Sequence, residues 1–157
     1  MTSPDTSSSA NASNIIALAS DHAGFALKAE LIEKLGALGL QVLDLGPADE
    51  NRVDYPDYGR KLAEAIAAGR AGRGIAICGS GIGISIAVNR NAAVRGALCH
   101  DVTTARLSRE HNDANVLCLG ARVTGLETAL DCVKAFLETP FAGGRHADRV
   151  AKLGEIT

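Results

Sequence analysis

The chain has few aromatic residues and almost no net charge. Among its 157 residues, aromatic side chains make up 3% and tryptophan is absent. So few rings argue against a base-stacking platform for single-stranded nucleic acid. The 16 Lys and Arg residues are offset by 18 Asp and Glu, which leaves a net charge of −2. That balance excludes a nucleic-acid binder driven by bulk positive charge, and we expect no nucleic-acid partner.

Long apolar runs are missing as well. No run approaches the roughly 20 residues needed to span a bilayer, so no membrane partner is expected. Residues 1–14 have neither the basic start nor the apolar stretch of a secretory signal, and Ser, Thr, Asn and Ala dominate them. We therefore predict a disordered tail over 1–14, a single domain over 15–153, a short tail over 154–157 and a cytoplasmic protein.

The four cysteines form no C-x-x-C pair, which argues against a zinc ribbon or a redox motif. No cluster of His, Cys and carboxylate residues has the spacing of metal ligands either, so we expect no metal. Cys99, Cys118 and Cys132 are predicted to act as small buried apolar residues. Cys78 differs, because a glycine-rich segment follows it directly.

Apolar runs and helical periodicity alternate along the chain. Strands are predicted over 15–20, 41–45, 74–78, 95–99 and 115–119. Helices are predicted over 24–38, 57–68, 82–90, 102–111, 125–138 and from 144 to about 153. This alternation indicates the α/β class: a three-layer α/β/α sandwich with a five-stranded parallel, Rossmann-like sheet and an added C-terminal helix.

Ligands of such sheets bind beyond the carboxyl ends of the strands. The segment CGSGIGIS over 78–85 lies at such a place, and its three glycines predict an anion site built from backbone N–H groups. It lacks the G-K-[ST] ending of a P-loop, and its G-x-G-x-G spacing is not the G-x-G-x-x-G of a dinucleotide site. Asp101, 18 residues beyond Gly83, keeps dinucleotide binding as a weaker alternative. A tight turn without a ligand is the other alternative.

Cys78 makes a chemical role for this loop more plausible than a purely binding one. A thiol at the start of a helix, beside free N–H donors, is favoured in its thiolate form. A base placed next to an oxyanion hole serves proton transfer, whereas a site that only binds a phosphate needs no base and no oxyanion hole. The loop therefore predicts a site of chemistry.

Charged pairs elsewhere give weaker signals. Asp21 and His22 follow the first predicted strand, where Asp21 could also simply cap the next helix. Arg145 and Arg149 lie four residues apart and so share one helix face. Two guanidinium groups there suit a phosphate dianion, although a solvated basic face is the commoner arrangement.

The remaining histidines are less informative. His111 ends a predicted helix, where an imidazolium would complement the helix dipole. His100 and His146 have no partner at a diagnostic spacing.

Six separated motifs together resemble one known family. They are SDHAG over 20–24, DYP over 54–56, CGSGIG over 78–83, SREHND over 108–113, GAR over 120–122 and GGRH over 143–146. In this order they resemble the type B ribose-5-phosphate isomerases, a family that also includes galactose-6-phosphate isomerase subunits and allose-6-phosphate isomerases. The resemblance runs from Ile15 to about Leu153.

The resemblance implies a cofactor-free aldose–ketose isomerisation of ribose 5-phosphate and ribulose 5-phosphate through a cis-enediolate. It implies that Cys78 moves a proton between C1 and C2. Ser80 stands where many members carry Thr and keeps the hydroxyl. His111 matches the residue linked to opening of the furanose ring, and Asp21 matches one that orients sugar hydroxyls.

The resemblance also implies how substrate is bound. The matched binding residues are His22, Tyr55, Gly79, Gly81, Ile82, Gly83, Asn112, Arg122, Arg145 and Arg149. The loop Gly79–Gly83 would hold the enediolate, Asn112 would orient hydroxyls, and Tyr55 would lie near the sugar. His22 and the arginines would bind phosphate, with Arg122 from either subunit. Family members are homodimers or dimers of dimers with composite sites.

Three alternatives follow from the same residues. The substrate could be another sugar phosphate, such as a six-carbon or tetrulose phosphate, because the size of the pocket is not visible in the sequence. The chain could instead be a non-catalytic module that binds a nucleotide or sugar phosphate, in which case Cys78 would be dispensable. An NAD-type oxidoreductase is the third alternative, against which the glycine spacing counts.

Overall fold

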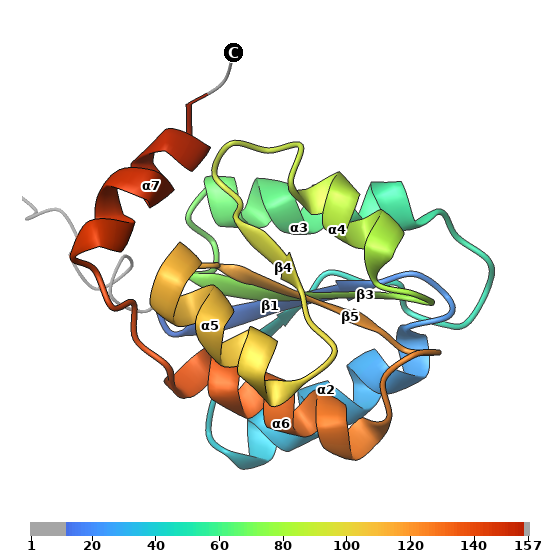
Figure 1. The fold of residues 1–157 in the computed structure, drawn as a ribbon. Coiled ribbons are helices and arrows are strands. Elements are labelled where there is room, and N and C mark those ends of the chain that lie inside the picture. Colours follow the sequence, from blue (N-terminus) through green and yellow to red (C-terminus); the bar gives the residue numbers. More distant parts are fainter. Residues whose placement is uncertain (1–11, 156–157) are drawn as a thin grey trace, which may run out of the picture.

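The computed structural model describes residues 12–155, in which strands and helices alternate (Figure 1). The strands are β1 (Ile15–Ser20), β2 (Gln41–Asp44), β3 (Arg73–Cys78), β4 (Gly96–Leu98) and β5 (Val116–Gly120). The helices are α2 (Phe25–Ala37), α3 (Tyr55–Ala67), α4 (Ile82–Val88), α5 (Val102–Asn112), α6 (Leu126–Glu138) and α7 (Arg145–Leu153).

The five strands form one parallel sheet in the order β2-β1-β3-β5-β4. After β1 the chain first adds β2 on one side and then returns to add β3 on the other. The neighbouring strands β1 and β3 therefore form the switch point where such sheets bind ligands. Ser20 pairs with Ile77, so the ends of these two strands lie level with each other.

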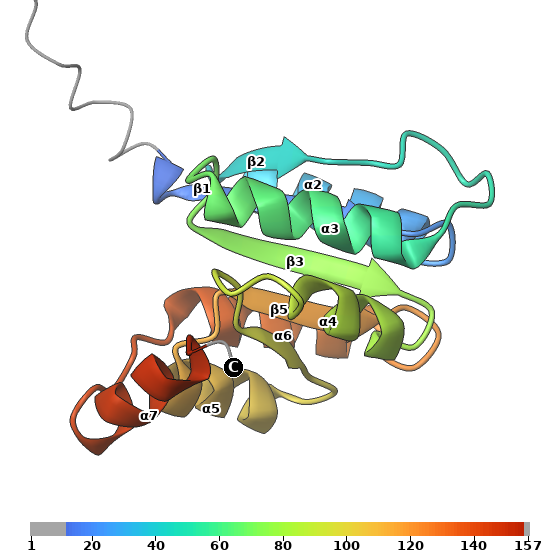
Figure 2. The same ribbon diagram turned by 90° about the horizontal axis from the view of Figure 1, so that it is seen from above.

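Helices cover both faces of the sheet, because alternate strand residues point to opposite sides (Figures 1 and 2). Ile16 and Leu18 of β1 belong to the core under α2, α5 and α6, whereas Ala17 and Ala19 belong to the core under α3 and α4. The predicted three-layer sandwich with a five-stranded parallel sheet and a C-terminal helix is confirmed.

Element boundaries differ from the predicted ones by one or two residues. Helix α3 begins at Tyr55 instead of residue 57, because Pro56 lies in the first turn, where its missing N–H costs nothing. Helix α4 ends at Val88 instead of residue 90. Gly39 ends the turn after α2 as predicted, with φ of +78°.

The predicted tails fall largely outside the described residues. Residues 1–11 and 156–157 lie beyond them, while 12–14 lead directly into β1. Backbone atoms of Ser13 lie so close to Gly72 that a Cβ there would come within 2.7 Å of the Ser13 carbonyl oxygen. Within 12–155, every helix is too short or too polar to cross a bilayer.

Candidate active site

A cavity of about 370 Å³ opens at the carboxyl ends of β1 and β3. Its lining residues are Asp21, Tyr55, Cys78, Gly79, Ser80, Gly83, Arg122 and Val123. All of these except Val123 are residues that the sequence singled out. They come from four separate parts of the chain, which only the sheet brings together. We call this group the Cys78 cavity.

The loop after β3 is built around the backbone of Gly81. Its φ of +80° is one that a residue with a side chain rarely adopts. A Cβ at Gly81 would lie 2.6 Å from the Leu98 side chain and 2.8 Å from the Leu119 carbonyl carbon. In this conformation the Gly81 N–H donates to Cys78 Sγ at 3.2 Å. Glycine here therefore allows the loop to fold back over the thiol.

Cys78 itself is the last residue of β3 and is 4% exposed. Next to it, the Ile82 N–H donates to Ser80 Oγ at 3.1 Å, so the serine hydroxyl closes the loop. Gly120 must lack a side chain because a Cβ there would overlap the Ser80 carbonyl. The loop is thus held between its own hydrogen bonds and the end of β5.

Asp21 and His22 occupy the turn that follows β1. Asp21 Oδ1 accepts a hydrogen bond from the Gly24 N–H at 3.0 Å and is largely buried. Asp21 thus closes the turn into α2 and also lines the Cys78 cavity, so the two interpretations of this residue are compatible. His22 Nδ1 lies 3.2 Å from the carbonyl oxygen of Val53 and 3.3 Å from its nitrogen. That contact ties the β1–α2 turn to the segment before Tyr55.

Arg122 and Tyr55 approach the loop where glycines leave room. The Arg122 Nη1 atom would lie 3.4 Å from a Cβ at Gly79. The Tyr55 ring packs against Gly83, where a Cβ would come within 2.6 Å of Cζ. Arg122 is therefore placed beside Cys78 in the same chain and needs no neighbouring subunit to reach the cavity.

The other predicted residues lie elsewhere. Helix α5 ends at Asn112, four residues before β5 begins, so His111 and Asn112 lie at the amino edge of the sheet. Figure 2 shows α7 beside them, away from the loop between β3 and α4. Asn112 lines a separate cavity of about 610 Å³ together with residues near the end of α7. We call the residues His111, Asn112, Arg145, His146 and Arg149 the His111 cluster.

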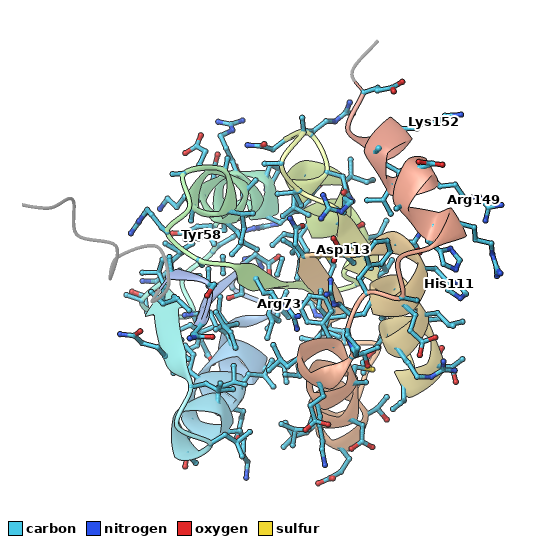
Figure 3. The ribbon with its side chains drawn as sticks, turned by 90° about the vertical axis from the view of Figure 1, so that its left-hand side faces the viewer. Tyr58, Arg73, His111, Asp113, Arg149 and Lys152 are labelled. Carbon is cyan, nitrogen blue, oxygen red and sulfur yellow. The ribbon has the colours of Figure 1, made fainter. Side chains whose placement is uncertain are left out.

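The His111 cluster contains a contact that the sequence did not reveal. The His111 and His146 rings are stacked, with centroids 4.5 Å apart and planes 15° from parallel. Figure 3 shows His111 and Arg149 on the two neighbouring helices α5 and α7. Partial desolvation, His111 and the two cluster arginines lower the pKa of His146. The sequence could not show this, because the two histidines are 35 positions apart with β5 and α6 between them.

An ion pair between buried Arg109 and half-buried Asp113 anchors the turn after His111. Asp113 caps α5 with φ of 47°, and its Oδ1 accepts from Arg109 at 2.8 Å. Arg109, which is 6% exposed, also donates to the Ala114 carbonyl at 2.7 Å. Arg95 donates to the Asp113 carbonyl at 2.9 Å. Figure 3 labels Asp113 and His111, and none of the three side chains Asp113, Arg109 and Arg95 was predicted to support the site.

The remaining cysteines are buried, as predicted. Burial raises the pKa of Cys99 and of Cys118, and raises that of Cys132 to about 11. These three thiols therefore stay protonated at neutral pH. They fill core space and take no part in the Cys78 cavity.

Comparison with known proteins gives the family. Residues 16–153 match the model of a family described as Ribose/Galactose Isomerase. The chain belongs to the ribose/galactose isomerase family. Ribose-5-phosphate isomerase B of Escherichia coli (strain K12) is 46% identical over 141 residues, which cover 90% of this chain and 95% of that protein. The resemblance found in the motifs is confirmed, and with it the prediction of an isomerase.

Other members of the ribose/galactose isomerase family support the fold and widen the range of substrates. The structure of Clostridium thermocellum ribose-5-phosphate isomerase B has a TM-score of 0.88 at 51% identity, covering 89% of this chain and 95% of that one. A D-erythrulose-4-phosphate isomerase of Pectobacterium atrosepticum is 42% identical over 141 residues, covering 88% of this chain and 92% of that protein. This chain is thus a sugar-phosphate isomerase of the ribose-5-phosphate isomerase B type.

Proposed function

We propose that this isomerase interconverts ribose 5-phosphate and ribulose 5-phosphate without a cofactor, with Cys78 as the proton-transfer base. One observation carries the proposal: a buried thiol, a folded-back glycine loop and an arginine meet at one cavity of about 370 Å³. A base beside N–H donors suits a reaction that develops negative charge on oxygen. Removing a proton next to a carbonyl is such a reaction.

The reaction can be written from these groups. The Cys78 thiolate takes the proton from C2 of the open-chain aldose. The C2–H electron pair forms the C1–C2 double bond, and the C1 carbonyl pair moves onto O1 to give the enediolate. Backbone N–H groups of Gly79–Gly83 stabilise this charge. The hydroxyl proton of O2 passes to O1, and Cys78 returns its proton to C1, which leaves the ketone at C2.

The Gly81 N–H supports the role of Cys78. It donates to Sγ at 3.2 Å and so stabilises negative charge on sulfur. Ser80 and Asp21 complete the reacting side of the cavity, with Asp21 held by the Gly24 N–H. Arg122 supplies positive charge for the phosphate from the same chain, and His22 is the other member of the proposed phosphate set that this chain provides.

We further propose a homodimer whose sites combine two chains. The Cys78 cavity and the His111 cluster lie at opposite edges of the sheet, so one chain cannot place both on one sugar. A two-fold axis that brings the partner's cluster to this cavity would create two complete sites at once. Tyr55, Ile82 and Ile86 are 42%, 54% and 54% exposed near the cavity, and such an interface would cover them.

In that dimer, the partner chain completes each site. Its His111 would open the furanose ring, and its Asn112 would orient hydroxyls. Its Arg145 and Arg149 would bind the phosphate together with Arg122. Binding energy at the phosphate would then position the reacting carbons over Cys78.

A four-carbon sugar phosphate is the second candidate substrate, because a relative 42% identical carries the name D-erythrulose-4-phosphate isomerase. The ratio of kcat/KM for ribose 5-phosphate and erythrose 4-phosphate decides between them. A higher value for the four-carbon substrate would replace the first proposal and keep the chemistry.

The decisive experiment measures conversion of ribose 5-phosphate to ribulose 5-phosphate, with a chelator present, by wild type and Cys78→Ala. We expect the variant to lose at least about 10²-fold in kcat with little change in KM. Cys132→Ala is the matched control, since it removes another buried thiol far from the cavity. Near-normal turnover by Cys78→Ala would rule out the base.

The shared site is tested by co-expressing Cys78→Ala and His111→Ala chains with different tags. Each variant alone is expected to be nearly inactive. A hybrid dimer purified through both tags would contain one intact site out of two, and so about half the wild-type activity. If each site lay within one chain, the hybrid would stay inactive.

A further inference from the structure

Helix α7 is held in place by few contacts. None of its nine residues is buried, and a helix of this length is not stable by itself in water. A hydrogen bond and a ring stack near the start of α7 join this part of the chain to the end of α5. The Ala142 N–H donates to the Glu110 carbonyl at 3.1 Å just before α7 begins. The His146 ring then stacks on His111, one residue further along α5.

The stack links the residue proposed to open the sugar ring to the arginines proposed to bind the phosphate. Arg145 is the neighbour of His146 in sequence, and Arg149 follows one turn later on the same helix. His111 lies in the last turn of α5. Fixing the His146 ring on the His111 ring therefore also fixes both arginines relative to His111.

Charge around the stack favours an uncharged His146. Partial desolvation comes first among the causes that lower its pKa, followed by His111, Arg145 and Arg149. A neutral ring stacks on a second imidazole without charge repulsion.

We propose that His146 is a positioning residue, which holds the His111 ring in one orientation by stacking and sets its distance from Arg145 and Arg149. This inference rests on the proposed function, in which His111 opens the sugar ring. In that step the C1–O4 bond breaks, the ring oxygen gains a proton, and the anomeric hydroxyl loses one. His111 mediates the proton movement, and His146 does not touch the sugar.

Comparing turnover in the two directions of the reaction distinguishes a loss of His111 positioning from a general loss of activity. Ribose 5-phosphate enters as a closed ring and needs opening. Ribulose 5-phosphate cannot close a furanose ring, because its C5 oxygen carries the phosphate. It enters open, and the aldose formed from it can leave open and close its ring in water. A misplaced His111 should therefore slow the enzyme mainly on ribose 5-phosphate.

The test compares His146→Ala, His146→Phe and the control Lys152→Ala, which alters α7 away from the stack. For His146→Ala we expect kcat on saturating ribose 5-phosphate to fall about 10- to 100-fold, the cost of a misplacement of about 1 Å. Turnover of ribulose 5-phosphate should stay within about threefold of wild type. His146→Phe keeps a flat ring and should recover most of the loss, while Lys152→Ala should change little.

Three kinetic results would overturn the proposal: unchanged kcat on ribose 5-phosphate in His146→Ala, equal losses of kcat with both substrates, or no recovery of kcat in His146→Phe. A second readout does not depend on turnover. The NMR signal of the His111 C2 proton should carry a ring-current shift in wild type and in His146→Phe, and lose it in His146→Ala. A shift that does not depend on residue 146 would also refute the stack. If the wild-type enzyme does not convert ribose 5-phosphate but its His111 signal shows the ring-current shift, the proposed function is refuted and the stack is not.

Discussion

Substituting Gly81 by alanine should damage both the fold and the Cys78 cavity. At φ of +80° an alanine costs about 1–2 kcal/mol. Its Cβ would also lie 2.6 Å from Leu98 and 2.8 Å from the Leu119 carbonyl carbon. Overpacking of that kind typically costs about 1–3 kcal/mol. The free energy of unfolding should thus fall by roughly 2–5 kcal/mol.

The same change should lower activity in the molecules that remain folded. The Gly81 N–H reaches Cys78 Sγ at 3.2 Å only while the loop keeps its conformation. If Gly81→Ala moves this N–H, the charge on sulfur and on the enediolate loses a donor. Removing one such donor typically costs about 10²–10³ in kcat.

Gly36→Ala is the matched control. Gly36 is exposed in α2, and a Cβ there would meet nothing within 4 Å. Alanine in a helix is favoured over glycine by about 0.5–1 kcal/mol, so this variant should be slightly more stable than wild type. The two substitutions are chemically identical and should have effects of opposite sign.

Urea unfolding of the three proteins measures the stability difference, with equal slopes required for the comparison. Turnover is then measured well below the unfolding transition. Gly81→Ala as stable and active as wild type would refute the role assigned to the loop backbone. A destabilised variant with full kcat would keep the packing argument and refute the link between the Gly81 N–H and catalysis.

Two further predictions concern the His111 cluster and its support. Asp113→Ala removes the carboxylate that Arg109 and Arg95 contact, and should lower the free energy of unfolding in urea by about 1–3 kcal/mol. Asp113→Asn keeps an acceptor and tolerates positive φ, so it should lower the free energy of unfolding by less. Equal decreases in the two variants would contradict the role assigned to the ion pair. An NMR titration should give His146 a midpoint below its ordinary pKa of about 6.5. The folded state then binds that proton less readily than the unfolded chain does. The contribution of His146 to stability is therefore present above about pH 6.5 and declines below it. A titration midpoint at or above 6.5 would contradict this pH dependence.

Much of the Cys78 cavity was predictable because its residues follow strands. Parallel strands end at the same edge, so Asp21 after β1 and Cys78 at the end of β3 had to lie near each other once the alternation was recognised. The glycine spacing identified the loop, because glycines permit backbone conformations that are set locally and so are visible in a short stretch of sequence. Arg122 was placed in the phosphate set by the resemblance, and the structure shows that its own chain brings it to the loop.

The His111 cluster was less predictable, because its contacts join segments distant in sequence. His146 had no partner at a telling spacing, and its stack on His111 depends on how the chain after α6 returns along α5. Arg109 and Asp113 read as ordinary surface charges of a helix end. Arg109 reaches Asp113 from a buried position, where it also donates to the Thr139 carbonyl in the chain that leads from α6 to α7.

The sequence by itself determined the layers, the strand and helix positions and the loop that surrounds Cys78. These follow from local patterns: apolar periodicity, glycine conformations and the direction of parallel strands. Only the tertiary structure decided that the recognised residues divide into two groups at opposite edges of the sheet, and that His146 and Asp113 support one of them. Side-chain contacts between distant segments depend on the packing of whole helices, which no short stretch of sequence encodes.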